Sequence, residues 1–331
     1  MASIGIIANP ASGKDIRRLV SYATVIDNNE KVNIVKRIVL AAQGYGVDDI
    51  YIMPDSYMMG AKVIDELTAE GALRSGCHVL EMPIRADAKD SARAAAMMNE
   101  MGVGCAVILG GDGTSRAVAK SIGETPILPL STGTNNVYPS MIEGTVAGIA
   151  AAIIALSPEP KRTCVHDKRI EIYLGGELKD IALIDTVISN ELCVGARAIW
   201  NASSISKIIV TRAHPASIGF SAAVGVLEIV TAEDDFGFAV CLGESGIAVK
   251  APLAAGVVEQ INLSSADKLK LRERHEHKFD KNCTIALDGE REIQIEKGDL
   301  IEICVDRTGP WRVDVHKTLE KAHDENFFRI E

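Results

Sequence analysis

Residues 110–114 (GGDGT) combine three glycines with a carboxylate and a hydroxyl, directly after an apolar run. Glycine lets the backbone turn sharply and approach a ligand closely, so that N–H groups can face phosphate oxygens. The carboxylate of Asp112 can bind a metal ion, or take a proton from a hydroxyl that attacks phosphorus. A tight turn between a strand and a helix, with Asp112 as the N-cap, explains the same residues. On spacing alone, both interpretations stay open.

Two further polar loops follow apolar runs. Residues 9–14 (NPASGK) offer the Ser12 hydroxyl, the Gly13 backbone and the Lys14 ammonium group to a phosphate. This loop is not a P-loop, because its glycine and lysine lack the GxxxxGK spacing. Residues 133–136 (GTNN) offer amides and a hydroxyl suited to sugar hydroxyls, an adenine edge or phosphate. Taken alone, each loop is also explained as a polar turn.

The chain around these loops alternates short apolar runs with helical spacing. We predict strands at 3–8, 49–53, 78–82, 106–109 and 126–130, and helices at 28–44, 59–70, 88–101 and directly after 110–114. Such alternation is typical of a parallel sheet with helices on both faces. Ligands of these sheets bind beyond the carboxyl ends of the strands. The three polar loops should therefore meet at one edge of the sheet.

Around residues 158–162 (PEPKR) the pattern changes to strand-like alternation. We predict strands at 169–174, 178–188, 207–211, 226–231, 236–242, 246–251, 257–263, 284–287, 292–296 and 299–305. The Asp-Gly pair at 288–289 is a preferred two-residue hairpin turn. The fold class is an α/β domain with a parallel sheet over residues 1–160, followed by a β-rich domain over residues 161–331. The tail from Thr318 is predicted to be a helix that packs back across the junction.

The composition disfavours nucleic acid as the main partner, while a local basic patch stays open. The chain has 35 basic and 45 acidic side chains, a net charge of −10 and a pI of about 5.3. Proteins that bind phosphate backbones normally have a basic surplus. With 4% aromatic residues there is also no stripe on which single-stranded bases could stack.

Cysteine usage and apolar segments indicate a cytoplasmic protein. The seven cysteines are widely spaced and form no CxxC pair, which argues against a zinc ribbon and a disulfide framework. Residues 1–9 are interpreted as a first strand rather than a signal peptide, because no basic segment precedes the apolar run. The apolar tract 141–156 is 16 residues long, whereas a bilayer needs about 20. We therefore expect no membrane insertion.

The three loops, in this order, resemble the ATP-NAD kinase and diacylglycerol kinase superfamily. GGDGT at 110–114 is preceded by an NPxSG pattern and followed by GTxN at 133–136. The stretch 9–20 (NPASGKDIRRLV) further resembles the NAD kinase-like proteins of acetoin catabolism. Late segments at 287–290 (LDGE) and 297–303 (KGDLIEI) are similar to both kinase types. The resemblance implies the kinase fold, with ATP and Mg²⁺ as cofactors.

The resemblance also implies roles for the matching residues. Asp112 is the expected catalytic acid/base and the group nearest Mg²⁺. The residues expected to hold the nucleotide are Asn9, Ser12, Gly13, Gly110, Gly111, Gly113, Thr114, Gly133, Thr134 and Asn135. Because the net charge is negative, local amides and Lys14 should bind ATP rather than long-range attraction. The acceptor is expected in the cleft between the two domains.

The acceptor site departs from the NAD kinase pattern. NAD kinases usually bind NAD with an Asn-Glu pair in a stretch like ALNEVV, and the matching stretch 182–187 is ALIDTV. Ile184 stands where Asn is expected, and an apolar side chain cannot replace the donor and acceptor of an amide. Asp185 can still accept a hydrogen bond from a hydroxyl, or it can lie on the solvent face of a strand.

The second-half motif DGE leaves a similar choice. Asp288 and Glu290 resemble the carboxylates of diacylglycerol-kinase-like enzymes, where a DGE carboxylate helps catalysis. A hairpin turn explains most of the same motif. Together with Asp185, these two residues are the candidate substrate-binding groups.

Three functions follow as hypotheses. The first is an ATP- and Mg²⁺-dependent kinase that phosphorylates a hydroxyl of NAD, with a role in acetoin catabolism. The second is a kinase of a lipid or a small diol, favoured by the DGE motif and the GTxN loop. The third is a nucleotide-binding accessory protein without turnover. Because NAD kinases commonly assemble as homo-oligomers, a homo-oligomer is expected.

Overall fold

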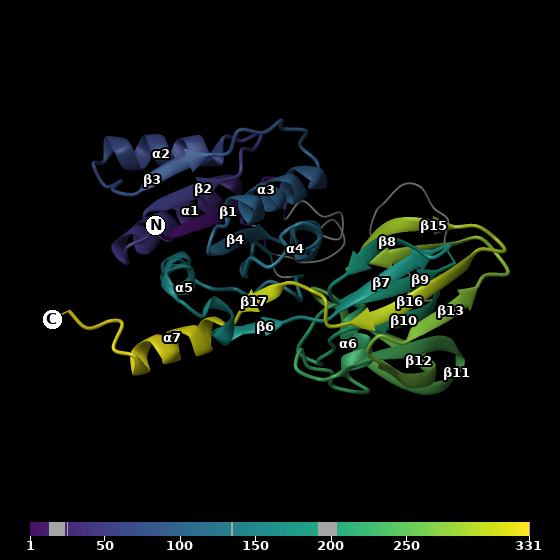
Figure 1. Ribbon diagram of the computed structural model, residues 1–331. Helices are drawn as coiled ribbons and strands as arrows, with labels where there is room; N and C mark the ends of the chain where they lie inside the picture. The colour runs from purple at the N-terminus through teal and green to yellow at the C-terminus, as the bar shows by residue number, and fades with distance from the viewer. Residues whose placement is uncertain (13–23, 25, 134, 191–203, 331) are drawn as a thin grey trace.

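Figure 1 shows the computed structural model of the chain. The model describes residues 1–12, 24, 26–133, 135–190 and 204–330. Helices surround a sheet in the purple-to-teal first half, whereas the teal-to-yellow second half consists mainly of strands (Figure 1). The predicted fold class, an α/β region with a mostly parallel sheet followed by a β-rich region, is confirmed.

The first region is built on a seven-stranded sheet in the order β3-β2-β1-β4-β5-β17-β6. Its strands are β1 (Ser3–Ala8), β2 (Asp49–Ile52), β3 (Gly76–Val79), β4 (Cys105–Gly110), β5 (Ile127–Ser131), β6 (Cys164–His166) and β17 (Trp311–Val313). The strands from β1 to β5 pair in parallel, and β17 pairs parallel to β5 but antiparallel to β6. The continuous apolar runs of β4 and β5 are fully buried, as expected for parallel strands covered on both faces.

Helices cover both faces of this sheet. On one face α1 (Asn28–Gly44), α2 (Met59–Ala69) and α5 (Gly144–Leu156) share a core with the sheet, and α7 (Val315–Asp324) packs at its border. On the other face lie α3 (Ala88–Met101) and α4 (Asp112–Ala119). Helices α1 and α5 approach closely because Gly148 has no side chain. A Cβ there would lie 2.6 Å from the Ile38 carbonyl oxygen.

The second region is a pair of antiparallel sheets. The six-stranded sheet has the order β12-β11-β10-β9-β14-β15, and the four-stranded sheet has the order β13-β16-β7-β8. The strands are β7 (Arg169–Leu174), β8 (Glu177–Ala182), β9 (Asp185–Ser189), β10 (Ile205–Val210), β11 (Phe236–Ala254), β12 (Val257–Lys270), β13 (Arg274–Lys278), β14 (Cys283–Leu287), β15 (Glu290–Ile295) and β16 (Leu300–Asp306). The two sheets bury one core between them, and the helix α6 (Phe220–Gly225) packs on the other face of the larger sheet.

The predicted strand 178–188 is wrong as a single element. It consists of β8 and β9, which belong to different sheets and are separated by Leu183 and Ile184. The backbone N–H groups at this break donate to the carboxylate of Asp288 instead of to a neighbouring strand. A contact with a distant residue therefore interrupts an apolar run that is locally suited to one strand.

Two further predictions for the second half are corrected. The predicted strand 226–231 is not a strand. This segment follows the end of α6, and within it only Val230 forms a β-bridge, with Ala213. The predicted strands 236–242 and 246–251 form the single strand β11, which has an irregular register between Leu242 and Ile247. Hydrophobic runs alone do not show whether a packed residue belongs to a ladder.

The end of the chain returns to the first region. Helix α7 begins after the N-cap Asp314, earlier than the predicted start at Thr318, and packs against α5. Segments on both sides of the predicted boundary at residues 160 and 161 contribute strands to the seven-stranded sheet. Across the described ranges, no helix has the length and apolar character needed to cross a bilayer.

Candidate functional site

The loop after β4 folds tightly around its glycines. A Cβ on Gly110 would lie 2.5 Å from the Cβ of Thr114, and a Cβ on Gly111 would lie 2.8 Å from Oδ1 of Asn136. The contact with the Cβ of Thr114 leaves no room for a larger residue at Gly110, whereas at Gly111 the end of the Asn136 side chain would have to move. The N-cap of α4 is Gly111, and Asp112 is the first residue of the helix. The alternative of Asp112 as the N-cap is therefore wrong.

Asp112 begins α4 and binds the loop that follows β5. Its carboxylate accepts the N–H of Tyr138 at 2.8 Å and that of Val137 at 3.1 and 3.2 Å. Only 8% of Asp112 is exposed. Charge-assisted hydrogen bonds from two backbone groups orient this carboxylate at the carboxyl edge of the sheet.

Side-chain hydrogen bonds join the three predicted loops. The Nδ2 group of Asn9 donates to Thr114 Oγ1 at 3.0 Å, and the hydroxyls of Ser12 and Thr132 lie 3.0 Å apart. The loops after β1, β4 and β5 therefore meet at one edge, as the alternation of strands and helices predicted. Gly133 also lies at this edge, where its carbonyl accepts from Ser131 Oγ at 2.6 Å. Three predicted residues, Gly13, Lys14 and Thr134, lie outside the described residues.

Lys31 is a buried cation beneath the first loop that the sequence analysis did not select. Its ammonium group donates to the carbonyl oxygens of Asn9 and Ser12, both at 2.9 Å, and to Asn28 Oδ1 at 3.2 Å. Lys31 is 1% exposed. A lysine within the apolar stripe of the predicted helix 28–44 was the available signal, since such a stripe normally excludes charge.

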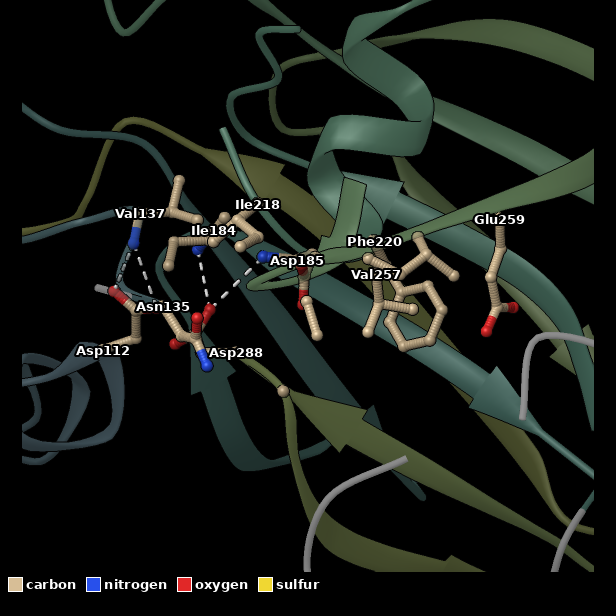
Figure 2. Close-up of a pocket in the computed structure, with 14 residues that line it drawn as sticks. Asp112, Asn135, Val137, Ile184, Asp185, Ile218, Phe220, Val257, Glu259 and Asp288 are labelled. Atoms are coloured by element: carbon tan, nitrogen blue, oxygen red, sulfur yellow. Dashed lines mark hydrogen bonds between the residues drawn. The ribbon is translucent and has the colours of Figure 1, made fainter. Parts of the chain in front are cut away.

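Between the two regions lies a cavity of about 340 Å³. Asp112, Asn135 and Val137 line it from the first region. The second region supplies Ile184, Asp185, Ile218, Gly219, Phe220, Leu253, Ala254, Val257, Glu259, Asp288 and Gly289. In Figure 2 Asp112 lies at one end of this pocket and Glu259 at the other. Two predicted substrate residues, Asp185 and Asp288, therefore share the pocket with the predicted catalytic carboxylate.

Asp288 occupies the turn between β14 and β15 in the left-handed region, with φ of 50°, and the next residue, Gly289, has φ of 81°. Its carboxylate accepts the N–H groups of residues 183, 184 and 185 at distances from 2.8 to 3.2 Å. Figure 2 shows the bonds from Ile184 and Asp185. Burial raises the pKa of Asp288 above its usual value, against the lowering effect of Arg116 and the three N–H groups. Asp185 is 6% exposed, which excludes the solvent-face alternative.

Arg116 connects α4 with this turn, and the sequence analysis did not select it. Its Nε lies 3.7 Å from Asp288 Oδ2, and its Nη1 lies 3.3 Å from Asp180 Oδ1. Arg116 lies four residues after Asp112, so both side chains are on one side of the helix. That spacing behind GGDGT was the signal that could have identified it.

Glu290 lies close to this cluster but is not among the residues that line the pocket. A Cβ on Gly113 would come within 2.9 Å of Glu290 Oε1, and Arg116 Nη2 is 3.8 Å from Glu290 Oε2. Asp185 and Asp288 thus share the cavity with Asp112, whereas Glu290 lies beside the start of α4, outside the cavity lining.

A buried ionic cluster anchors the loop that holds Asp112. The hydroxyl of Tyr138 donates to Asp167 at 2.6 Å, and Arg312 and Arg212 each lie 2.8 Å from the same carboxylate. Burial alone would raise the pKa of Asp167, but the charges of Arg212 and Arg312 hold it below its usual value. Residues from distant parts of the chain therefore fix the position of Tyr138, whose backbone binds Asp112.

No group of three or more His, Cys, Asp and Glu side chains within the described chain is arranged to hold a metal ion. Mg²⁺ is usually held by one or two carboxylates together with substrate phosphates and water. Asp112, as a single oriented carboxylate beside three polar loops, fits that kind of site.

The chain is similar over nearly its whole length to a curated protein. It is 35% identical over 337 residues to the acetoin catabolism protein X of Cupriavidus necator, covering 98% of this chain and 94% of that protein. The chain belongs to the acetoin catabolism protein X family. The model of the C-terminal domain of that family matches residues 168–308, and the model of the ATP-NAD kinase N-terminal domain matches residues 4–157.

This acetoin catabolism protein X family member is also similar in fold to solved structures. Yeast NADH kinase, solved with NADH, has a TM-score of 0.51 and 13% identity, covering 100% of this chain and 89% of that one. A putative diacylglycerol kinase from Bacillus anthracis str. Sterne has a TM-score of 0.48 and 10% identity, covering 94% and 97%. The match to the ATP-NAD kinase N-terminal domain confirms the resemblance to ATP-NAD kinases inferred from the motifs, and the fold is like that of NAD kinases.

Proposed function

We propose that this protein is an ATP- and Mg²⁺-dependent phosphotransferase, in which Asp112 accepts the proton of an attacking hydroxyl. One observation carries the proposal. The carboxylate of Asp112 is oriented by two backbone N–H groups and lies in the wall of a cavity at the carboxyl edge of the parallel sheet. Phosphoryl transfer requires mainly positioning and electrostatic stabilisation, together with a carboxylate near the attacking oxygen.

The three loops provide the groups for the phosphate side of this reaction. Gly110 and Gly111 allow the backbone to pack closely, and the start of α4 presents N–H groups and the positive end of its dipole. The Lys31 ammonium group adds a positive charge beneath the first loop. In the proposed site Asn9, Ser12 and Gly133 support this loop cluster. Mg²⁺, when bound with ATP, would neutralise phosphate charge.

The reaction is a displacement at the γ-phosphorus. An acceptor hydroxyl oxygen forms a bond to the γ-phosphorus, the bond from that phosphorus to the bridging oxygen of ADP breaks, and the hydroxyl proton passes to Asp112. Asp185 is placed in the same cavity, where its carboxylate can orient the acceptor. NAD is the acceptor expected from the kinase resemblance. Ile184 in the lining disfavours NAD, because its apolar side chain replaces the Asn with which NAD kinases bind NAD.

The decisive experiment compares the wild type with Asp112→Asn. Purified protein is incubated with ATP, Mg²⁺ and NAD or uncharged hydroxyl compounds, and phosphorylated products are identified by mass spectrometry. General-base catalysis contributes roughly 10²–10⁴-fold, so the variant should lose at least about 10²-fold in kcat. Its affinity for ATP without Mg²⁺, measured by calorimetry, should stay within about threefold, because the loops that bind phosphate are unchanged.

The outcome separates the three hypotheses. An Asp112-dependent product supports a kinase, and its identity distinguishes NAD from a lipid or a small diol. ATP binding without turnover by either protein would overturn the proposal in favour of a nucleotide-binding accessory protein.

The biological context is part of the proposal. The name of the relative suggests a role in acetoin catabolism, and the family resemblance suggests a cytoplasmic homo-oligomer. Size-exclusion chromatography with light scattering measures the subunit number. Growth of a deletion strain on acetoin as the carbon source tests the metabolic role.

A further inference from the structure

Tyr138 is held both by its backbone and by its side chain. Its backbone N–H donates to Asp112 Oδ1 at 2.8 Å, and its hydroxyl donates to Asp167 Oδ2 at 2.6 Å. Tyr138 is 2% exposed, and the guanidinium carbon of Arg212 lies 4.8 Å from the centroid of its ring. Because a buried aromatic side chain occupies one rotamer, fixing the ring and the hydroxyl also restricts the backbone N–H. Tyr138 therefore connects the carboxylate of Asp112 with that of Asp167.

Asp167 is a fixed anchor for this hydroxyl. It is fully buried where the chain passes from β6 to β7. Its backbone N–H donates to the carbonyl of Pro310 at 3.1 Å, and its own carbonyl accepts the N–H of Gly309 at 2.9 Å. A Cβ on Gly309 would lie 2.7 Å from that carbonyl oxygen. The two segments that pass between the regions thus hold each other, and they fix the backbone of Asp167 independently of its side chain.

Two guanidinium groups orient the Asp167 carboxylate. Arg312, on β17, donates from Nε to Oδ2 at 2.8 Å and from Nη2 to Oδ1 at 3.2 Å. Arg212, which follows β10 of the second region, has its Nη2 at 2.8 Å from Oδ1. Both carboxylate oxygens are therefore paired with cations, and the oxygen that accepts the Tyr138 hydroxyl cannot turn away without separating these charges.

Stability alone does not account for this cluster. Apolar residues of similar volume can often replace a buried ion cluster without loss of stability. What the hydrogen bonds add is a defined geometry. A displacement of about 1 Å at a reacting centre can lower the rate by about 10²-fold. Asp112 depends on such a geometry, because the two N–H groups that orient its carboxylate belong to a single loop.

We propose that Asp167 and Tyr138 are positioning residues for phosphoryl transfer; this rests on the proposed phosphotransferase function. Asp167 holds Tyr138 by its hydroxyl, and the backbone of Tyr138 holds the Asp112 carboxylate in line with the acceptor hydroxyl. Neither positioning residue is among those that line the described cavity. Their loss should therefore lower kcat and leave the KM values of ATP and of the acceptor unchanged.

The test compares Tyr138→Phe with the matched control Tyr173→Phe in the full-length protein. Tyr138→Phe removes only the hydroxyl, and Asp167 keeps its two arginines, so the variant should fold. Tyr173, on β7, also donates its hydroxyl to a carboxylate, that of Glu171 at 2.5 Å, and is not among the described lining residues. Release of ADP is measured with ATP, Mg²⁺ and, as acceptor, NAD, glycerol or diacylglycerol in detergent micelles.

Tyr138→Phe should lower kcat about five- to tenfold and leave both KM values within about twofold. Tyr173→Phe should behave like the wild type. In an Asp112→Asn background, Tyr138→Phe should change kcat by less than about twofold, because no carboxylate is left to align. An unchanged kcat, an equal loss in both backgrounds, or a rise in KM alone would overturn the positioning role while the phosphotransferase function stands.

The NMR resonances of the loop amides report the alignment without turnover. The N–H groups of residues 137 and 138 bind a carboxylate in the wild type, and Asp112→Asn provides the reference for the loss of that charge. In Tyr138→Phe both amide proton resonances should move towards this reference, whereas Tyr173→Phe should leave them in place. Asp167→Asn weakens the same hydroxyl contact from the other side and should move them in the same direction.

The two readouts distinguish the failure of the two proposals. If the wild type phosphorylates no probe, the phosphotransferase function fails, and the catalytic purpose of the positioning residues fails with it, even where the amide resonances move. If the amide resonances of Tyr138→Phe stay at their wild-type positions, the link from Asp167 to Asp112 is overturned, whether or not the wild type is a kinase.

Discussion

The two Asp-Gly turns of this protein use the same dipeptide in different ways. Asp112-Gly113 begins a helix in the first region, and Asp288-Gly289 joins two strands in the second. Both carboxylates are buried, line one cavity and accept backbone N–H groups of a neighbouring segment. The likeness in sequence therefore extends to the hydrogen bonds.

The difference lies in what each carboxylate stabilises. Asp288 binds three consecutive N–H groups at the break between β8 and β9, and Arg116 faces it across 3.7 Å. Asp112 binds the N–H groups of a single loop and belongs to the cluster of polar loops. An aspartate in a glycine turn can thus serve mainly the fold or be placed for chemistry, and the two cases are separated by the partners of its oxygens.

The largest expected effect separates the two carboxylates by stability. Asp288→Ala leaves Arg116 without this buried partner and three N–H groups without an acceptor, so the free energy of unfolding should fall by about 3–5 kcal/mol. Asp112→Ala removes two backbone hydrogen bonds and should cost about 1–3 kcal/mol. Urea unfolding followed by circular dichroism measures both. Equal losses in the two variants would contradict the comparison.

Arg116 tests the link between the two turns. Arg116→Met removes the charge that faces Asp288 while retaining much of the volume, and should lower the free energy of unfolding by about 2–3 kcal/mol. Lys120→Met is the matched control at the C-cap of the same helix. Its ammonium group pairs with Asp180 at 2.6 Å but is 38% exposed, so the loss should stay below about 1 kcal/mol. The same urea titration would refute this role of Arg116 if the control lost as much.

Tyr138 tests whether the two turns are anchored independently. Tyr138→Phe removes the hydroxyl bound to Asp167 but leaves the two arginines beside that carboxylate, so the loss of unfolding free energy should be about 1 kcal/mol. Combined with Asp288→Asn, the two losses should add within about 0.5 kcal/mol, because separate contacts hold the two turns. A double-mutant cycle measures the coupling, and a larger coupling energy would show that the turns act as one unit.

The smallest expected effect is a pH dependence of Asp288. Burial raises the pKa of Asp288, so the folded protein keeps this proton to higher pH than the unfolded chain. Stability from this group is therefore present below its usual pKa and is lost as pH rises through the raised value. Asparagine does not titrate. We therefore expect the difference in unfolding free energy between the wild type and Asp288→Asn to shrink as pH rises from about 4 to about 8. A constant difference in unfolding titrations would contradict the raised pKa.

Local sequence patterns predicted the first region well. The bounds of β1, α1 and α3 agree with the prediction, because each apolar pattern ends at a clear local signal. Asp27 and Asp87 cap the starts of α1 and α3 with their side chains, and Gly102 ends α3 in the left-handed conformation. The third strand was less well predicted, since it begins at residue 76 rather than 78.

Long-range contacts limited the prediction of the second region. The break between β8 and β9 is stabilised by Asp288, which is 105 residues away from Leu183 in the chain. Lys31 and Arg116 were missed because their partners, the carbonyl groups of the first loop and the carboxylate of Asp288, belong to other segments of the chain. Glu259 had no local signal at all, since its place in the pocket depends on how β12 folds over α6.

The sequence by itself determined the alternation of strands and helices, and with it the meeting of three polar loops at one sheet edge. The physical reason is that apolar spacing is local and parallel strands end on the same side. Only the tertiary structure decided which carboxylates bind backbone groups and which line the cavity with Glu259. Those roles depend on the N–H groups, cations and apolar walls that distant segments bring within hydrogen-bonding or van der Waals distance.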